Sequence, residues 1–177
     1  MAKWCVFLSA LAALGTAVAS AQMSPPKPAL ELKRLDYFVG TWTLQADLKP
    51  SQFGPGGKMT ETEINKWMEG EFFLLSHVEF KSSMGNGTGI AIMGYDPENK
   101  VYTFNAFNSW GEAEHSKGTL DGDTWTWLSD ATIMAKPTKT RFTIKEVSAD
   151  TYSTKFEMAS DDGSWSRVME GSAKRSK

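Results

Sequence analysis

The chain carries only two histidines, and each could act as a general base or as a ligand. His77 lies two residues before Glu79, and the predicted pairing of the strands around it places it opposite Glu63. A carboxylate beside an imidazole can orient it for proton transfer, but the same pair on an outer face would be a solvated contact that contributes little. His115 follows Glu114 directly, and adjacent strand residues point to opposite faces, so these two do not chelate an ion together. One hypothesis is therefore acid–base catalysis by His77 or His115 with Glu63 or Glu79.

Other standard chemistries lack their sequence signatures. The chain has no His-x-x-x-His spacing for zinc and no Gly-x-Ser-x-Gly around a nucleophilic serine. The glycines of residues 54–57 are followed neither by Gly-Lys-Ser/Thr nor by a helical pattern, which argues against a phosphate-binding loop. The basic block at residues 174–177 is typical of a solvated tail rather than of a nucleic-acid interface. We predict no metal, no cofactor and no nucleic-acid partner.

The N-terminus has the pattern of a secretory signal. A lysine precedes an apolar run over residues 6–18, and small residues at 19–21 offer a cleavage site before Gln22. We expect residues 1–21 to be removed and the protein to be periplasmic or secreted, with an uncleaved membrane anchor as the alternative. The single cysteine, Cys5, lies inside this leader, so the mature protein has neither a disulfide nor a cysteine ligand. No later apolar run is long enough to span a bilayer.

Beyond the leader, the composition divides the chain into three parts. Prolines predict an extended linker over residues 22–29. A single domain over residues 30–174 and a short tail at 175–177 follow. Within the domain, apolar residues at helical spacing predict a helix of about two turns over residues 30–38.

The rest of the domain has the period of β-strands. Alternation of apolar and polar residues begins at Trp42, and Gly40 allows the turn from the helix into this first strand. Turn signals such as Asn86-Gly87 and Asp121-Gly122 separate the later alternating segments, and no crossover helix interrupts them. We predict an all-β fold, an up-and-down antiparallel barrel of about ten strands, because closure removes exposed edges. A β-sandwich is the alternative.

The pattern of the second and third strands predicts which face lies inside. A turn at residues 69–71 would gather the apolar side chains of both strands on one face and leave Glu63, His77 and Glu79 on the other. We take the apolar face as the interior, where a barrel of this size can enclose a small ligand. The predicted ligand-lining residues are Phe72, Leu74, Val78, Trp125, Trp127 and Phe142.

Five stretches of the domain carry a resemblance: Leu35-Asp36-Tyr37-Phe38-Val39-Gly40-Thr41-Trp42, Gly94-Tyr95-Asp96-Pro97, Gly118-Thr119-Leu120-Asp121-Gly122-Asp123, Thr140-Arg141-Phe142-Thr143-Ile144 and Val168-Met169-Glu170-Gly171. Together they resemble the lipocalin-like (calycin) barrels, and most closely a bacterial exported family catalogued as a domain of unknown function. The resemblance extends from Leu30 to about Lys174. It implies a fold, not a reaction.

The resemblance also implies how the barrel closes. Calycin barrels commonly place an arginine of the last strand over the first-strand tryptophan, so Gly40, Trp42 and Arg167 are the expected closure residues, with Arg141 as the competing arginine. Heme-binding relatives use a histidine on the C-terminal strands, and this chain has none after His115, which argues against heme.

The hypothesis from the sequence is an exported protein that binds a small, largely apolar or aromatic molecule in a barrel cavity. The alternatives are a barrel-pocket enzyme using the histidines and glutamates named above, or an envelope interaction module without a ligand. We favour binding over catalysis, because a carrier needs only a lined cavity.

Overall fold

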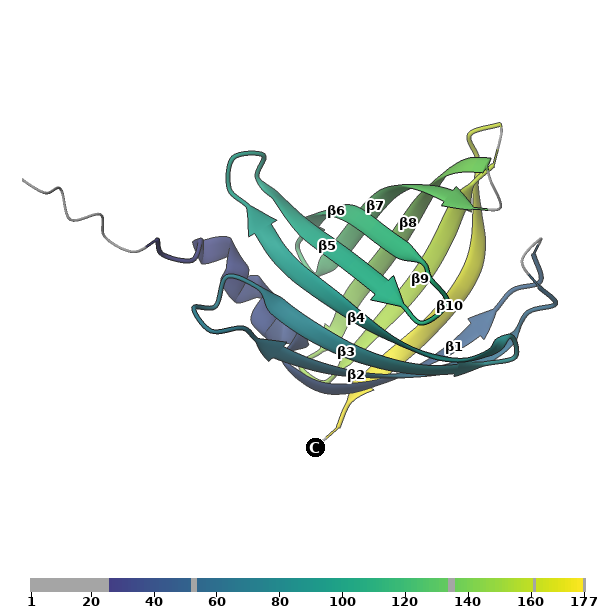
Figure 1. Ribbon diagram of the computed structural model, residues 1–177, viewed down its shortest axis with the longest axis horizontal. Coiled ribbons are helices and arrows are strands. Elements are labelled where there is room, and N and C mark those ends of the chain that lie inside the picture. The colour runs from purple at the N-terminus through teal and green to yellow at the C-terminus, as the bar shows by residue number, and fades with distance from the viewer. Residues whose placement is uncertain (1–25, 52–53, 134–135, 161, 177) are drawn as a thin grey trace, which may run out of the picture.

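The computed structural model describes residues 26–51, 54–133, 136–160 and 162–176, so the predicted signal peptide lies outside it. A short 3-10 helix, η1, precedes ten antiparallel strands (Figure 1). In the described part of the chain, no helix is both long and apolar enough to cross a bilayer. The elements are η1 Leu30–Phe38, β1 Gly40–Leu48, β2 Gly57–Trp67, β3 Leu74–Ser82, β4 Gly85–Asp96, β5 Val101–Asn108, β6 Ala113–Asp121, β7 Thr124–Ile133, β8 Lys136–Ser148, β9 Thr151–Ala159 and β10 Trp165–Arg175.

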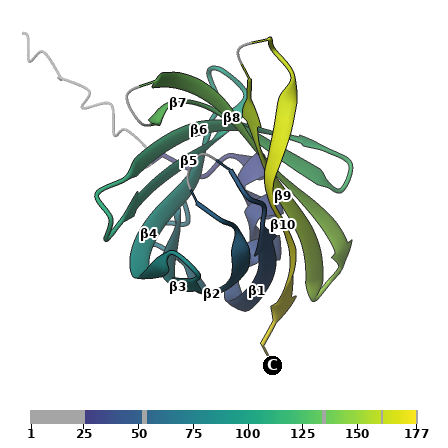
Figure 2. The same cartoon turned by 90° about the vertical axis from the view of Figure 1, so that its right-hand side faces the viewer.

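The ten strands form one closed sheet. Each strand pairs with its neighbours in sequence, and β1 also pairs with β10. At this seam Trp42 lies opposite Arg175 of β10 and opposite Glu63 of β2. Figure 2 looks into the barrel from the end away from η1. The predicted all-β, up-and-down barrel is confirmed, and the sandwich is excluded because the β1–β10 pairing leaves no free edge.

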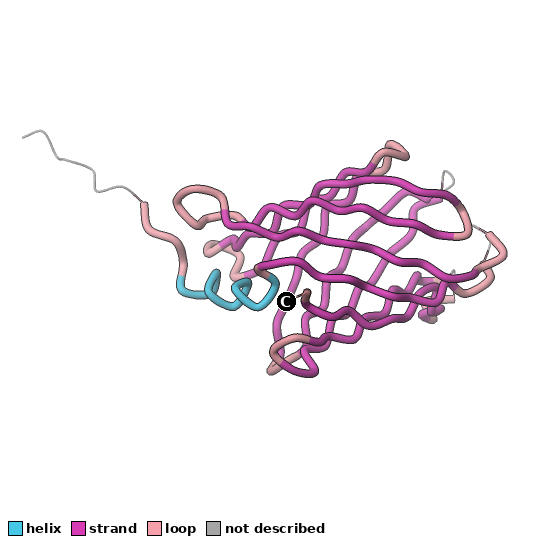
Figure 3. The backbone as a smooth tube through the Cα atoms, turned by 90° about the horizontal axis from the view of Figure 1, so that it is seen from below, coloured by secondary structure: helices cyan, strands magenta, loops and turns pink. Residues whose placement is uncertain are grey.

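The helix η1 covers one end of the barrel (Figure 3). Leu32, Leu35 and Phe38 recur every three residues, which is the repeat of a 3-10 helix, and all three are buried. Gly40 then turns the chain into β1 with a φ of 113°, a conformation that favours glycine. The predicted helix is confirmed, and the three-residue repeat explains why it is a 3-10 helix.

The last strand is longer than expected. β10 continues through Arg175, which was predicted to begin the tail, and it pairs there with Trp42. A residue in a basic terminal run therefore belongs to the barrel wall.

The pairing of β2 with β3 differs from the prediction by one residue. Ile64 pairs with His77 and Trp67 with Leu74, so residues 68–73 form the connecting loop in place of a tight turn at 69–71. A shift of one residue reverses the faces of one strand relative to the other.

In this register, the face of β2 that was predicted to point outward points into the barrel. Glu61 and Glu63 point into the barrel with Asn65, which is fully buried, while Ile64 is 42% exposed on the outside. Val78 on β3 keeps its predicted inward position, since it lies opposite Glu63. The prediction that the glutamates of β2 face outward was wrong.

Candidate functional site

One side of the inner wall is aromatic. Trp125 and Trp127 of β7 stack with their ring planes 6° apart and their centroids 6.1 Å apart, and Phe104 of β5 lies 5.6 Å from Trp127. Gly118 of β6 makes room for this arrangement, because a Cβ there would lie 2.4 Å from the Trp127 ring. Phe142 of β8 lies directly opposite Trp127 in the sheet. Of these rings, Phe104 and Phe142 are half-buried and offer aromatic surface to a ligand, whereas Trp125 and Trp127 are almost completely buried.

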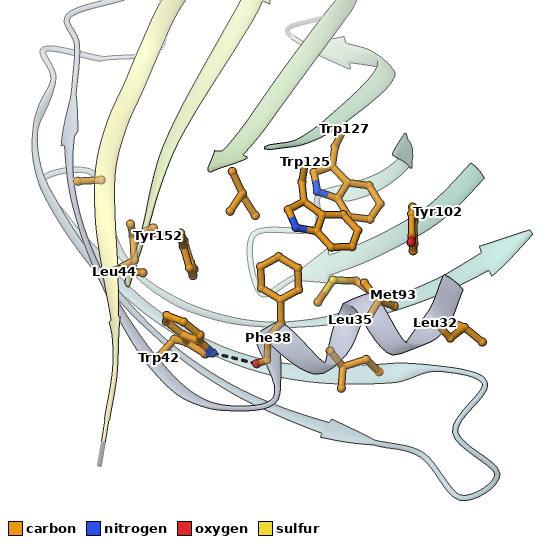
Figure 4. Close-up of a cluster of buried hydrophobic side chains, with 14 residues drawn as sticks. Leu32, Leu35, Phe38, Trp42, Leu44, Met93, Tyr102, Trp125, Trp127 and Tyr152 are labelled. Atoms are coloured by element: carbon orange, nitrogen blue, oxygen red, sulfur yellow. Dashed lines mark hydrogen bonds between the residues drawn. The ribbon is translucent and has the colours of Figure 1, made fainter. Parts of the chain in front are cut away.

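Aromatic side chains also form the floor above η1. Phe38 contacts Trp125 at 5.3 Å and Tyr152 at 6.1 Å, and Tyr152 lies 4.9 Å from Trp42. Figure 4 shows the Phe38 ring between the tryptophans of β7 and the Trp42–Tyr152 pair. The Trp42 Nε1 donates a hydrogen bond of 2.9 Å to the Phe38 carbonyl oxygen, which ties β1 to the end of η1. The floor is therefore closed and fixed in position.

Glu61, Glu63 and Asn65, which point inward from β2, are polar, in contrast to the aromatic side chains of β5, β7 and β8. The Glu63 carboxylate accepts hydrogen bonds from the Tyr152 hydroxyl at 3.4 Å and from the Asn65 Nδ2 at 3.3 Å. Asn65 Nδ2 also donates to the Phe38 carbonyl oxygen at 3.0 Å. The Asn65 Oδ1 is buried and has no hydrogen-bond partner within the described part of the chain. Glu61 forms a side-chain hydrogen bond with Glu63. The cluster is thus rich in acceptors.

The environment of this cluster changes its protonation. Burial, followed by the charge of Glu63 and the hydrogen bond with it, raises the pKa of the Glu61 carboxyl well above its usual value. Burial and the charges of Glu63 and Glu61 likewise raise the pKa of the Tyr152 hydroxyl. Tyr152 therefore remains a neutral donor, and Glu61 holds a proton more readily than a free glutamate, because a second negative charge this close opposes its ionisation.

In the described part of the chain, no basic side chain forms an ion pair with Glu61, Glu63 or Glu114. Glu114 points inward from β6 and accepts a hydrogen bond from Ser116. Arg175 points inward at the closed end, where backbone carbonyls and Trp42 occupy its guanidinium. Within the described side chains, the wall above the floor is acidic.

Solvent reaches the inner wall from the open end. Phe104, Phe142, Val78 and Glu61 point inward yet are only half-buried, whereas Trp125 beside the floor is fully buried. An inward side chain can stay accessible only where the interior is not completely filled. The structure thus has a closed aromatic floor and an accessible upper wall.

Gly40 and Trp42 lie at the closed end, but the arginine over Trp42 is not the predicted one. The guanidinium over Trp42 belongs to Arg175, at 4.4 Å from the ring centroid. Arg167 instead forms an ion pair with Glu170 at 2.5 Å on the outer surface. The register explains the error, because Trp42 lies opposite Arg175. The competing candidate, Arg141, lies over Trp165 on the outside.

The histidines lie away from the inner acids. His77 is exposed on the outer face between Ile64 and Ile90, on the opposite side of the sheet from Glu63. His115 is also exposed, where its Nδ1 lies 2.7 Å from the Asn105 Oδ1. The predicted His77–Glu63 pairing is therefore wrong, and Glu79 is exposed on the outside with His77.

The predicted lining residues divide into two groups. Leu74, Val78, Trp125, Trp127 and Phe142 point inward as expected, although Leu74 and Trp125 belong to the floor. Phe72 lies in the β2–β3 loop and not on a strand. Its predicted place on the inner wall was wrong.

Sequence reasoning missed three members of the cluster: Glu61, Asn65 and Tyr152. The signal was available in the alternation of Glu61, Glu63 and Asn65 on one face of a strand. It was read as an outer face because polar alternation normally faces solvent.

The outer surface has a depression of about 920 Å³ over β1, β2, β8, β9 and β10. Outward-facing polar residues such as Gln45 line most of it. Its charges are largely neutralised, since Lys58 pairs with Asp47 and Arg167 with Glu170, both at 2.5 Å. In the described residues, no group of three or more metal-binding side chains is placed to hold an ion.

Comparisons with known proteins agree with this fold. A family model described as "Protein of unknown function (DUF1579)" matches residues 27–175, and no curated protein matches the chain. The crystal structure of Rv2717c from M. tuberculosis aligns with a TM-score of 0.58 at 12% identity, over 85% of this chain and 100% of that chain. The S-type phycobiliprotein lyase CPES from Guillardia theta aligns with a TM-score of 0.56 at 11% identity, over 82% and 92%. At these identities the likeness is one of fold.

Proposed function

Because this chain belongs to the DUF1579 family and folds as a lipocalin-like barrel, we propose that it binds a small, largely apolar or aromatic molecule inside that barrel. The family description assigns no reaction, so the argument depends on the inner wall. We propose further that the protein is exported, with residues 1–21 as its signal peptide and a barrel domain from residue 30 onward.

The observation that carries this proposal is the accessible aromatic wall above a closed floor. Phe104 and Phe142 point inward and are only half-buried, whereas Trp127 is 3% exposed, so a planar ligand entering from the open end could stack on the two phenylalanine rings. Small-molecule sites are typically concave and lined by aromatic side chains with a few placed polar groups. The structure from Guillardia theta shows that the same fold occurs in a protein named as a phycobiliprotein lyase.

Binding is favoured over histidine catalysis. Both histidines lie on the outer face, so an acid–base pair with Glu63 would need a group on the other side of the sheet. A carrier requires only the lined interior, which the structure has.

The first experiment is native mass spectrometry of the protein purified from its own host, which should reveal a co-purified small molecule. The second uses N-phenyl-1-naphthylamine, a neutral aromatic probe whose fluorescence rises in an apolar site. Saturable binding by the wild type is expected. Phe142→Leu should weaken it at least about fivefold, the effect of losing an aromatic contact of about 1 kcal/mol.

Phe107→Leu is the matched control, because Phe107 of β5 is 44% exposed on the outer face of the barrel. It should leave probe affinity unchanged. Absence of saturable binding, or equal weakening by the two substitutions, would contradict a ligand site on the inner aromatic wall.

A further inference from the structure

The cluster on β2 has more hydrogen-bond acceptors than donors. The cluster contains two carboxyl groups, those of Glu61 and Glu63. Its two side-chain donors, the Asn65 Nδ2 and the Tyr152 hydroxyl, both bond to Glu63. A carboxylate can accept about four hydrogen bonds, so these two donors leave lone pairs of the carboxyl groups without a partner in the described side chains. The cluster is therefore incomplete as it stands.

Asn65 provides a second, independent sign of a missing donor. Its side chain is 0% exposed, and its amide lies against Glu63, with Nδ2 3.3 Å from the carboxylate oxygen. The Oδ1 of this same amide is buried and has no hydrogen-bond partner among the described residues. A buried acceptor without a donor is costly, and native proteins rarely leave one unless water or a ligand supplies the donor.

The charged side chains described on the inner wall above the floor are negative. Glu61, Glu63 and Glu114 point inward without an ion-pair partner in the described part of the chain, and the guanidinium of Arg175 is occupied at the closed end. In a site of low dielectric constant, such an arrangement attracts cations and repels anions.

The acidic cluster and the aromatic floor are in contact. Tyr152 donates to Glu63 and also lies 6.1 Å from Phe38, which in turn contacts Trp125 at 5.3 Å. Trp125 stacks with Trp127 of the upper wall. A ligand that lies above this closed floor can therefore present a polar group to β2.

From this juxtaposition we infer that the ligand is an aromatic cation, a planar apolar body carrying a protonated amine or amidine that donates hydrogen bonds to Glu61, Glu63 and the Asn65 Oδ1. This inference rests on the proposed function and adds the chemical class of the ligand. It excludes anionic aromatic ligands, which would add a further negative charge beside Glu63.

Proton release is a second consequence. Burial and the neighbouring Glu63 carboxylate raise the pKa of Glu61, so this carboxyl holds a proton more readily than a free glutamate. A bound cation stabilises both carboxylates, so binding should release up to about one proton per ligand. A neutral ligand of the same shape should release none.

The test compares three probes that share one ring system: 1-naphthylmethylamine, 1-naphthylmethanol and 1-naphthoate. Isothermal titration calorimetry at pH 7 gives their affinities, and repetition in phosphate and Tris buffers gives the proton release. The amine should bind at least about tenfold more tightly than the alcohol, equivalent to about 1.4 kcal/mol, and the carboxylate should bind most weakly.

Glu63→Gln should reduce the affinity for the amine at least about tenfold without changing that for the alcohol. Its amide oxygen can still accept from Tyr152 and Asn65, and circular dichroism will confirm that the variant folds. Glu61→Gln should abolish proton release. Glu79→Gln is the matched control, because it makes the same charge change on the outer face of β3.

The outcomes separate the two proposals. If the alcohol binds and the amine gains nothing, the inferred cation site is refuted while the aromatic site stands. Equal losses in Glu63→Gln and Glu79→Gln would also refute it, since the effect would then be one of overall charge. If none of the three probes binds, both proposals are contradicted.

Discussion

Replacing Arg175 by alanine should destabilise the barrel far more than replacing Arg167. The Arg175 guanidinium lies 4.4 Å from the centre of the Trp42 ring and donates to the carbonyl oxygens of Tyr37 at 2.8 Å and Ala149 at 3.0 Å. It also donates to the carbonyl of Val39. One side chain thus joins β10 to the end of η1, the start of β1 and the β8–β9 turn.

The expected magnitude follows from these contacts. The cation–π contact with a buried indole and the charged hydrogen bonds to backbone carbonyls, discounted because the side chain is 26% exposed, together suggest a loss of about 3 kcal/mol. For a domain of this size, that corresponds to a fall in Tm of about 6–12 °C. Arg167 forms a solvated ion pair with Glu170, so its removal should stay within the scatter of surface substitutions.

Thermal unfolding followed by circular dichroism distinguishes these expectations. Arg175→Lys is the informative intermediate, because lysine keeps the charge but loses the planar set of donors that reaches several carbonyls. Its Tm should lie between those of the wild type and Arg175→Ala. Equal Tm values for Arg175→Ala and Arg167→Ala would refute the assignment of Arg175 as the closure arginine.

Three further predictions concern the floor, the acidic cluster and the aromatic wall. Trp42→Ala removes a fully buried side chain, so urea denaturation should show a loss of about 3–5 kcal/mol; an unchanged midpoint would contradict its closure role. The pKa of Glu61 is raised above the usual 4.5, so the folded protein binds a proton there more tightly than the unfolded chain does. The stability that this proton contributes is present at low pH and is lost as the pH rises above 4.5. Denaturation across pH should therefore show a shallower decline for Glu61→Gln than for the wild type, and identical slopes would count against the buried pair. Gly118→Ala would place a Cβ 2.4 Å from the Trp127 ring. Near-ultraviolet circular dichroism should therefore show a disturbed tryptophan pair, and the free energy of unfolding should fall by about 1–3 kcal/mol. An unaltered spectrum would show that the ring can move aside.

The sequence predicts the architecture because local signals agree with the global fold. Leu32, Leu35 and Phe38 mark the helix, Gly40 supplies the conformation that ends it, and alternation from Trp42 onward gives the period of the first strand. Each of these signals depends on residues close together in the chain, and closure then follows from the need to remove exposed edges.

The closure arginine depends on a contact that no local signal describes. Arg175 lies in a basic terminal run, which on its own resembles a solvated tail. Its role appears only when β10 pairs with β1 and places it opposite Trp42. Arg167 was chosen because it lies in the last strand, but its position along that strand puts it at the other end of the barrel.

The register of β2 could not be read from hydrophobicity. A tight turn would have placed Ile64 inside and the glutamates outside, which is the arrangement that burial of apolar surface favours. The observed loop, residues 68–73, shifts the pairing by one residue and leaves Ile64 42% exposed. Burial alone therefore does not account for the residue types on this strand.

The reversal of β2 is itself an argument for a ligand. Burying Glu61 and leaving the Asn65 Oδ1 without a donor both oppose folding, and exposing Ile64 adds nothing to offset them. Local rules that a fold violates at a cost are most often violated where residues serve binding rather than stability. Here the violation lies on the inner wall, within contact of the aromatic floor and open to solvent from one end. A donor-bearing aromatic molecule would satisfy the acceptors and cover the rings at once, so a single occupant accounts for both features of the interior.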